Sequence, residues 1–130
     1  MKSHFLFCLF LSVFTAKLTF ADRGISSNVE FKIAFGSCGK QTHPLPIFDE
    51  VIKQDPNIFI FLGDNIYGDT NDMDILRKKY QELGTKESYK HLIENTEVLA
   101  TWDDHDYGQN DAGKHYPHKE ESKEIFLEFF

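Results

Sequence analysis

Residues 58–67 read IFIFLGDNIY, a run of five apolar residues that ends in glycine, aspartate and asparagine. A continuous apolar run of this length is typical of a strand covered on both faces of a sheet. Two other segments share the pattern, because residues 31–38 read FKIAFGSC and residues 98–106 read VLATWDDHD. If the three runs are parallel strands, their polar ends meet at the carboxyl edge of one sheet, where open α/β sheets bind ligands. A thiol, a phenol, carboxylates and an imidazole would then share one crevice.

Helical patterns lie between and after these predicted strands. Apolar residues recur at helical spacing in four segments, which predicts helices over residues 47–52, 72–83 and 88–95 and from residue 120 onward. Residues 103–119 are polar and contain glycine and histidine, and are predicted to form a loop. Alternating strands and helices predict an α/β fold rather than a bundle or a sandwich. The last helix has no predicted partner for its apolar face, so we expect the chain to be the first part of a longer domain.

The beginning of the chain has the composition of an export signal. A short, weakly positive start is followed by an apolar stretch over residues 5–16, and small residues at 19–21 precede a cleavage point. The stretch is shorter than the about 18 to 20 residues that a membrane span needs, and Lys17 ends it. We expect residues 1–21 to be cleaved and residues 22–130 to reach the periplasm or the outside. The alternative is an uncleaved N-terminal anchor.

The charge of the chain limits its partners. The formal net charge is −7, and removing residues 1–21 takes away two lysines and no acid, which leaves −9. Binding to a nucleic-acid backbone needs a basic face, so we expect no nucleic-acid partner. An acidic exported chain is better suited to binding cations.

Cysteine use points to the same edge of the sheet. After cleavage only Cys38 remains, so the exported chain cannot form an internal disulfide. A lone thiol in an oxidising compartment is buried, paired with another chain or bound to a metal. Cys38 follows Gly36 and Ser37 at the end of a predicted strand rather than inside its apolar part, which favours metal binding over a core position.

The acidic run over residues 103–106 is the most specific of the three clusters. Its carboxylates repel one another unless water or a cation neutralises them. A solvated acidic loop is the usual reason for such a run, but this one directly follows Trp102 at the end of an apolar strand. His105 is therefore a candidate ligand or a proton donor to a leaving group, and Asn110 or Asp111 is a candidate oxygen ligand. For Asp64, a tight turn that needs Gly-Asp-Asn only for its backbone geometry is the alternative.

These motifs together resemble the PhoD-like metallophosphatases, the alkaline phosphatase D family of the calcineurin-like phosphoesterases. The resemblance covers residues 31–130 and rests on the motifs FGSC at 35–38, FLGDNIYGD at 61–69 and ATWDDHDYG at 100–108. The segment that begins with NDAG at 110–113 and continues through Tyr116-Pro117 to the closing FLEFF at 126–130 is similar as well.

The resemblance implies a four-layer αββα sandwich, of which this chain would supply the first strands and helices. It implies a multinuclear centre of iron and calcium. Cys38 and Tyr67 would bind iron, and Asp64 would bridge metals. Asp104 would be a further ligand, at a position where relatives carry asparagine, and His105 would lie near the scissile phosphate. By the same resemblance Asp103 and Asn110 are weaker candidate ligands.

The family's later metal ligands have no counterpart in these residues, so the resemblance implies a truncated N-terminal portion over 22–130. The function it implies is a secreted phosphoesterase that hydrolyses phosphate esters with a metal-activated water. Two alternatives from other classes are an extracellular calcium-binding module without catalysis and an inactive fragment. A thiol ligand speaks against the calcium module, because calcium prefers oxygen.

Overall fold

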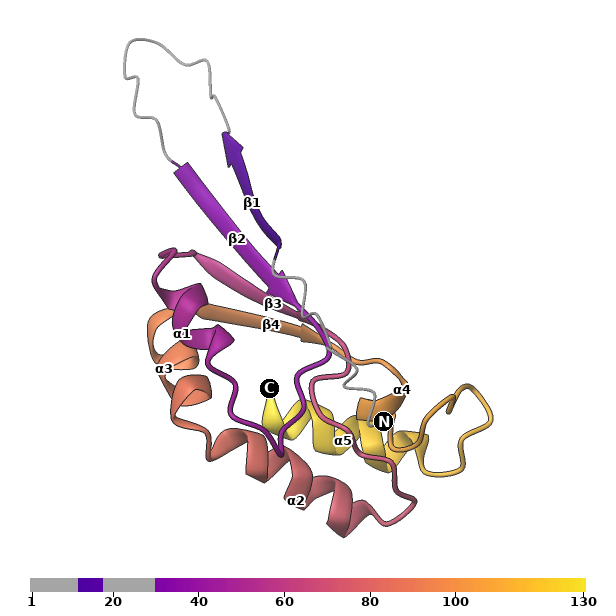
Figure 1. Cartoon of the computed structure of the whole chain (residues 1–130). Coiled ribbons are helices and arrows are strands. Elements are labelled where there is room, and N and C mark those ends of the chain that lie inside the picture. The colour runs from indigo at the N-terminus through magenta and orange to yellow at the C-terminus, as the bar shows by residue number, and fades with distance from the viewer. Residues whose placement is uncertain (1–11, 18–29) are drawn as a thin grey trace, which may run out of the picture.

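The computed structural model describes residues 12–17 and 30–130. Its described part is a mixed α/β fold with one sheet and five helices (Figure 1). The elements in chain order are β1 (Ser12–Lys17), β2 (Glu30–Gly36), α1 (Ile47–Ile52), β3 (Ile58–Leu62), α2 (Met73–Gly84), α3 (Glu87–Asn95), β4 (Glu97–Thr101), α4 (Asp104–Tyr107) and α5 (Lys119–Phe129).

The sheet has the order β1-β2-β3-β4, and the strands β2, β3 and β4 run parallel to one another. Ile60 of β3 lies opposite Phe35 of β2 on one side and Leu99 of β4 on the other. The parallel arrangement of the three predicted strands is thereby confirmed. Strand β1 adds an antiparallel edge beside β2, and the sequence interpretation did not predict it.

One face of the sheet carries the core. Ala34, Phe59 and Phe61 point to this face and are buried beneath the helices. Phe48 of α1 meets Phe59 and Phe61 with ring centroids 5.9 and 5.7 Å away, in edge-on contacts that aromatic rings prefer. Tyr89 of α3 continues the cluster 6.1 Å from Phe61. The helices lie on this side of the sheet in Figure 1.

The expectation that the last helix lacks a partner is wrong. Ile125 and Phe126 of α5 are buried, and Phe129 stacks on Tyr89 at 5.5 Å. Phe130 lies 5.3 Å from Phe61, so the closing aromatic pair packs against the core. These contacts join residues far apart in sequence, which is why helical periodicity alone did not reveal them.

The predicted helices over 47–52, 72–83 and 88–95 are confirmed with small shifts of their ends. The predicted loop over 103–119 is wrong in one place, because it contains the short helix α4 and ends where α5 begins at Lys119. Asp103 and Asp106 form a capping box at the start of α4, an arrangement that satisfies the free amides of a helix start.

The predicted leader over residues 1–21 lies mostly outside the described residues, and the strand β1 that falls within it does not test cleavage. Within residues 12–17 and 30–130, no helix has both the length and the apolar character to cross a bilayer.

Candidate metal centre

Three chain segments bring their polar residues to one edge of the sheet. Cys38 follows β2, Asp64 follows β3 and Asp104 follows β4. Because the three strands are parallel, these positions meet at their common carboxyl end (Figure 1). Backbone hydrogen bonds hold two of the segments together, since the amides of Cys38 and Gly39 donate to the carbonyls of Gly63 and Asp64 at 3.3 and 2.9 Å.

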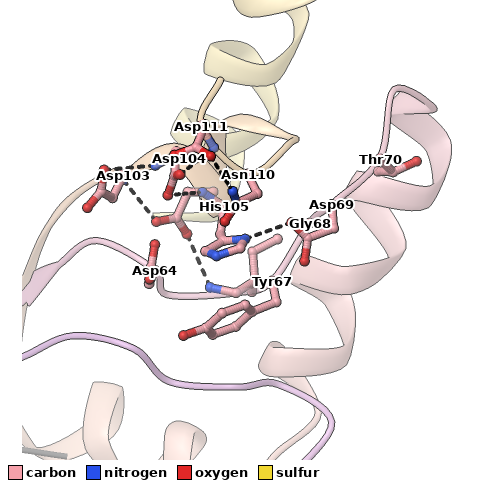
Figure 2. A network of polar contacts seen from close by, with 12 residues as sticks. Asp64, Tyr67, Gly68, Asp69, Thr70, Asp103, Asp104, His105, Asn110 and Asp111 are labelled. Atoms are coloured by element: carbon pink, nitrogen blue, oxygen red, sulfur yellow. Dashed lines mark hydrogen bonds and ion pairs between the residues drawn. The ribbon is translucent and has the colours of Figure 1, made fainter. Parts of the chain in front are cut away.

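Asp64, Asp104 and His105 form a compact group of candidate ligands. One ligand atom from each lies within 4.8 Å of the other two, and Figure 2 shows the three side chains converging. Burial raises the pKa of Asp64 more than the nearby His105 lowers it. Carboxylate and imidazole groups placed this close together can hold a cation, whose charge would relieve the crowding of the carboxylates.

The carboxylate of Asp64 is incompletely satisfied by the protein. Its Oδ1 is buried and has no hydrogen-bond partner among residues 12–17 and 30–130, whereas its Oδ2 lies 3.6 Å from the thiol sulfur of Cys38. A buried carboxylate oxygen without a partner is costly, and a bound metal ion would remove that cost. The residues present therefore fit a metal at this position. The chain holds this turn in left-handed conformations, with φ of +99° at Gly63 and +50° at Asp64.

Cys38 and Tyr67 lie beside this group, as the sequence predicted. The ring of Tyr67 lies 4.3 Å from the imidazole of His105, centroid to centroid. Burial raises the pKa of Tyr67, and the charges of Cys38 and Asp64 raise it further. Without a metal the phenol is therefore neutral, and a bound cation would be needed to hold it as a phenolate.

Asp103 and Asn110 make other contacts. The Oδ1 of Asp103 accepts from the amide of Asp104 at 2.9 Å as the cap of α4. Asn110 is exposed, and its Nδ2 donates to Oδ2 of Asp111 at 2.7 Å. The ligand roles of both residues stay predictions. Asp104 itself is fixed from two sides, by the amides of His105 and Asp111 at 2.9 and 2.6 Å.

Sequence reasoning missed three residues that support this group. Asp69 lies 2.7 Å from Nδ1 of His105, and the buried Gln41 accepts from the amide of Tyr67 at 2.9 Å. Asp106 is 1% exposed and accepts hydrogen bonds from two loops at once. Asp103 and Asp106 have the spacing of a capping box, and this spacing could have identified Asp106 from the sequence.

A hollow opens beside the ligand group. Its volume is about 340 Å³, which is in the range of sites for small organic molecules. Asp104 belongs both to the hollow and to the ligand group. The other residues that line it are Trp102, Asp103, Tyr107, Ala112, Gly113 and Lys114.

Comparison of the chain with protein-family models, with curated proteins and with solved structures gave no match. Its function has to be inferred from its residues and their geometry.

Proposed function

We propose that this chain is the N-terminal portion of an exported, metal-dependent phosphoesterase with an αββα fold like that of the PhoD-like metallophosphatases. The observation that carries the proposal is the convergence of Asp64, Asp104 and His105 within 4.8 Å at the carboxyl edge of the parallel strands. Cys38 and Tyr67 beside them add a thiol and a phenol. Such a mixed donor set suits a transition metal together with a hard, oxygen-preferring ion.

The proposed metals are iron and calcium. Cys38 and Tyr67 would hold iron, and Asp64 would contact both ions. Asp104 would be a further oxygen ligand. When bound, the metals would lower the pKa of a water molecule and neutralise charge on the phosphoryl oxygens. The Oδ1 of Asp64 supports this use, because it is one of two buried side-chain oxygens, with that of Asn65, that find no hydrogen-bond partner in the described part of the chain.

His105 is proposed as the proton donor to the leaving oxygen. Burial alone would lower its pKa, but Asp69 and the nearby carboxylates of Asp64 and Asp104 outweigh burial and raise it. In the metal-free chain these carboxylates therefore favour the protonated form, which is the form that a general acid requires. Because Nδ1 is hydrogen-bonded to Asp69, Nε2 is the ring nitrogen that can donate a proton to the leaving oxygen of the substrate. The hollow beside Asp104 would take the alcohol part of the ester.

Metal content and turnover together test the proposal. The purified chain, with and without residues 1–21, is loaded with iron and calcium, and bound metal is counted by elemental analysis. Hydrolysis of an aryl phosphate monoester and of an aryl diester is then followed. His105→Ala is expected to lower turnover about 10²–10⁴-fold with metal content unchanged. His115→Ala is the matched control, since His115 is exposed on the neighbouring loop.

The outcomes separate the alternatives. Metal binding with turnover that depends on His105 supports the phosphoesterase. Calcium binding without iron or turnover would instead favour an extracellular calcium-binding module. Failure to bind either metal would overturn the proposal for this chain.

A further inference from the structure

We infer that Asp106 is a positioning residue, which fixes the distance between the two ligand-bearing loops of the proposed metal centre. This inference rests on the proposed function. Asp106 is 1% exposed and belongs neither to the residues that line the hollow nor to the ligand group. Its carboxylate instead receives hydrogen bonds from the loop after β3, the start of α4 and the helix α2.

The contacts are numerous for one side chain. The amide of Asn65 lies 3.0 and 3.1 Å from the two carboxylate oxygens, and the amide of Ile66 lies 3.1 Å from Oδ1. The amide of Asp103 lies 3.1 Å from Oδ2. From α2, the hydroxyl of Tyr80 donates to Oδ1 at 3.2 Å. Hydrogen bonds to an ionised carboxylate are stronger and geometrically more specific than those between neutral groups.

The positions of these donors link Asp106 to the proposed ligands. Asn65 directly follows Asp64, and the pair Asp104 and His105 lies between Asp103 and Asp106. A shift of either loop against the other would change the spacing of the ligand oxygens of Asp64 and Asp104 and the place of His105 beside them. Metal affinity depends on such spacing, and replacement of outer-shell partners commonly costs 10–100-fold in affinity.

A purely structural role is the competing explanation. A buried capping residue stabilises its helix whether or not a metal binds nearby. The two roles differ in one respect: a structural residue lowers stability, whereas a positioning residue also weakens metal binding in the protein that is still folded.

The test compares three variants under conditions in which each is folded. Asp106→Asn keeps the size of the side chain but replaces one acceptor oxygen with an amino group that clashes with the donor amides. Tyr80→Phe removes only the hydroxyl donor. Leu92→Ala is the stability control, because Leu92 is fully buried in α3 and touches neither loop in the contacts described above.

The first readout is the affinity for Tb³⁺, a luminescent substitute for calcium. Its luminescence is excited through Trp102, the only tryptophan of the chain, which directly precedes Asp103. We expect Asp106→Asn to bind Tb³⁺ about 10–100-fold more weakly. Tyr80→Phe should lose about three- to fivefold, the value of one hydrogen bond, and Leu92→Ala should stay within about twofold of the unchanged chain. Equal losses in Asp106→Asn and Leu92→Ala, or no loss in Asp106→Asn, would overturn the inference. If Asp106→Asn does not fold, an unchanged affinity in Tyr80→Phe would overturn it.

A second readout needs no metal and separates this inference from the proposed function. The other cysteine of the sequence, Cys8, is first replaced by serine so that only one thiol reacts. The reaction rate of Cys38 with a thiol reagent is then measured, because its sulfur lies 3.6 Å from Asp64 Oδ2. We expect Asp106→Asn to change this rate several-fold, and Leu92→Ala to leave it unchanged. If the unchanged chain binds no metal but the thiol rate responds, the proposed function fails and the positioning role stands. An unresponsive thiol would contradict the positioning role.

Discussion

The imidazole of His105 is oriented by Asp69: Nδ1 of the histidine lies 2.7 Å from Oδ1 of the aspartate. Figure 2 shows the two side chains joined in this way while the far side of the ring points toward Asp64. A carboxylate in this position fixes the tautomer of a histidine and raises its basicity. Asp69 is separated from Asp64 by only four residues, so one loop after β3 supplies both a candidate ligand and the group that orients its neighbour.

The Asp69–His105 pair gives a prediction about proton affinity. Asp69→Asn keeps the shape of the side chain but removes its charge, so the pKa of His105 should fall from its raised position. Titration of the histidine ring protons by NMR measures this directly. Turnover of the metal-loaded chain should fall about 10–100-fold. Asp74→Asn, on the exposed first turn of α2, is the control and should change neither quantity. An unchanged pKa of His105 in Asp69→Asn would show that Asp69 does not set the protonation of the imidazole.

The thiol and the phenol give a prediction about metal selectivity. Cys38→Ser and Tyr67→Phe should each lower iron occupancy, because they remove the ligands that favour iron over calcium. Terbium affinity should change much less, since Asp64 and Asp104 provide the oxygen ligands. Elemental analysis after loading with a mixture of the two metals provides the measurement. Equal loss of both metals would mean that Cys38 and Tyr67 support the loops rather than bind iron.

The sheet and its functional edge could be predicted because they depend on local patterns. The apolar run 58–62 identifies a strand from its own residues, but the expectation that both faces are covered is wrong, since Phe59 and Phe61 are buried and Leu62 is 45% exposed. Three such runs followed by polar clusters predict where those clusters meet. The helix α4 was missed because the acidic run 103–106 has the composition of a loop, and only the contacts of Asp103 and Asp106 make it helical. The roles of Asp69 and Asp106 depend on contacts across 36 and 41 positions of sequence, which no local pattern contains.

The turn after β3 gives a prediction about backbone geometry. Gly63 has a φ of +99°, and a Cβ added there would lie 2.7 Å from Cβ of Asp103. Gly63→Ala should therefore lower the free energy of unfolding by about 2–5 kcal/mol through backbone strain and overpacking. Gly113→Ala is the control, because a Cβ at Gly113 meets nothing within 4 Å, and it should change the value by less than about 0.5 kcal/mol. Urea titration of the two variants measures the difference, and similar losses would contradict this account of the turn.

The aromatic core gives a prediction about alkaline pH. Burial raises the pKa of Tyr89 to about 12, whereas a tyrosine in the unfolded chain titrates near 10. Between about pH 10 and 12 the unfolded chain has lost a proton that the folded chain retains, so stability falls as the pH rises through this range. Two pKa units correspond to about 2–3 kcal/mol for this one group.

Tyr89→Phe keeps the ring that stacks on Phe129 and removes the titrating hydroxyl. Burial also raises the pKa of Tyr80, so both proteins should lose stability in alkali, but the variant should lose about 2–3 kcal/mol less between pH 10 and 12. Urea unfolding at a series of pH values measures the two curves. The difference in free energy of unfolding between the two proteins should be constant below pH 9. Above that pH the variant should gain stability relative to the unchanged chain. Parallel curves up to pH 12 would mean that the Tyr89 hydroxyl reaches water in the folded chain, and the packing of α3 against α5 would have to be looser than the contacts of Tyr89 and Phe129 require.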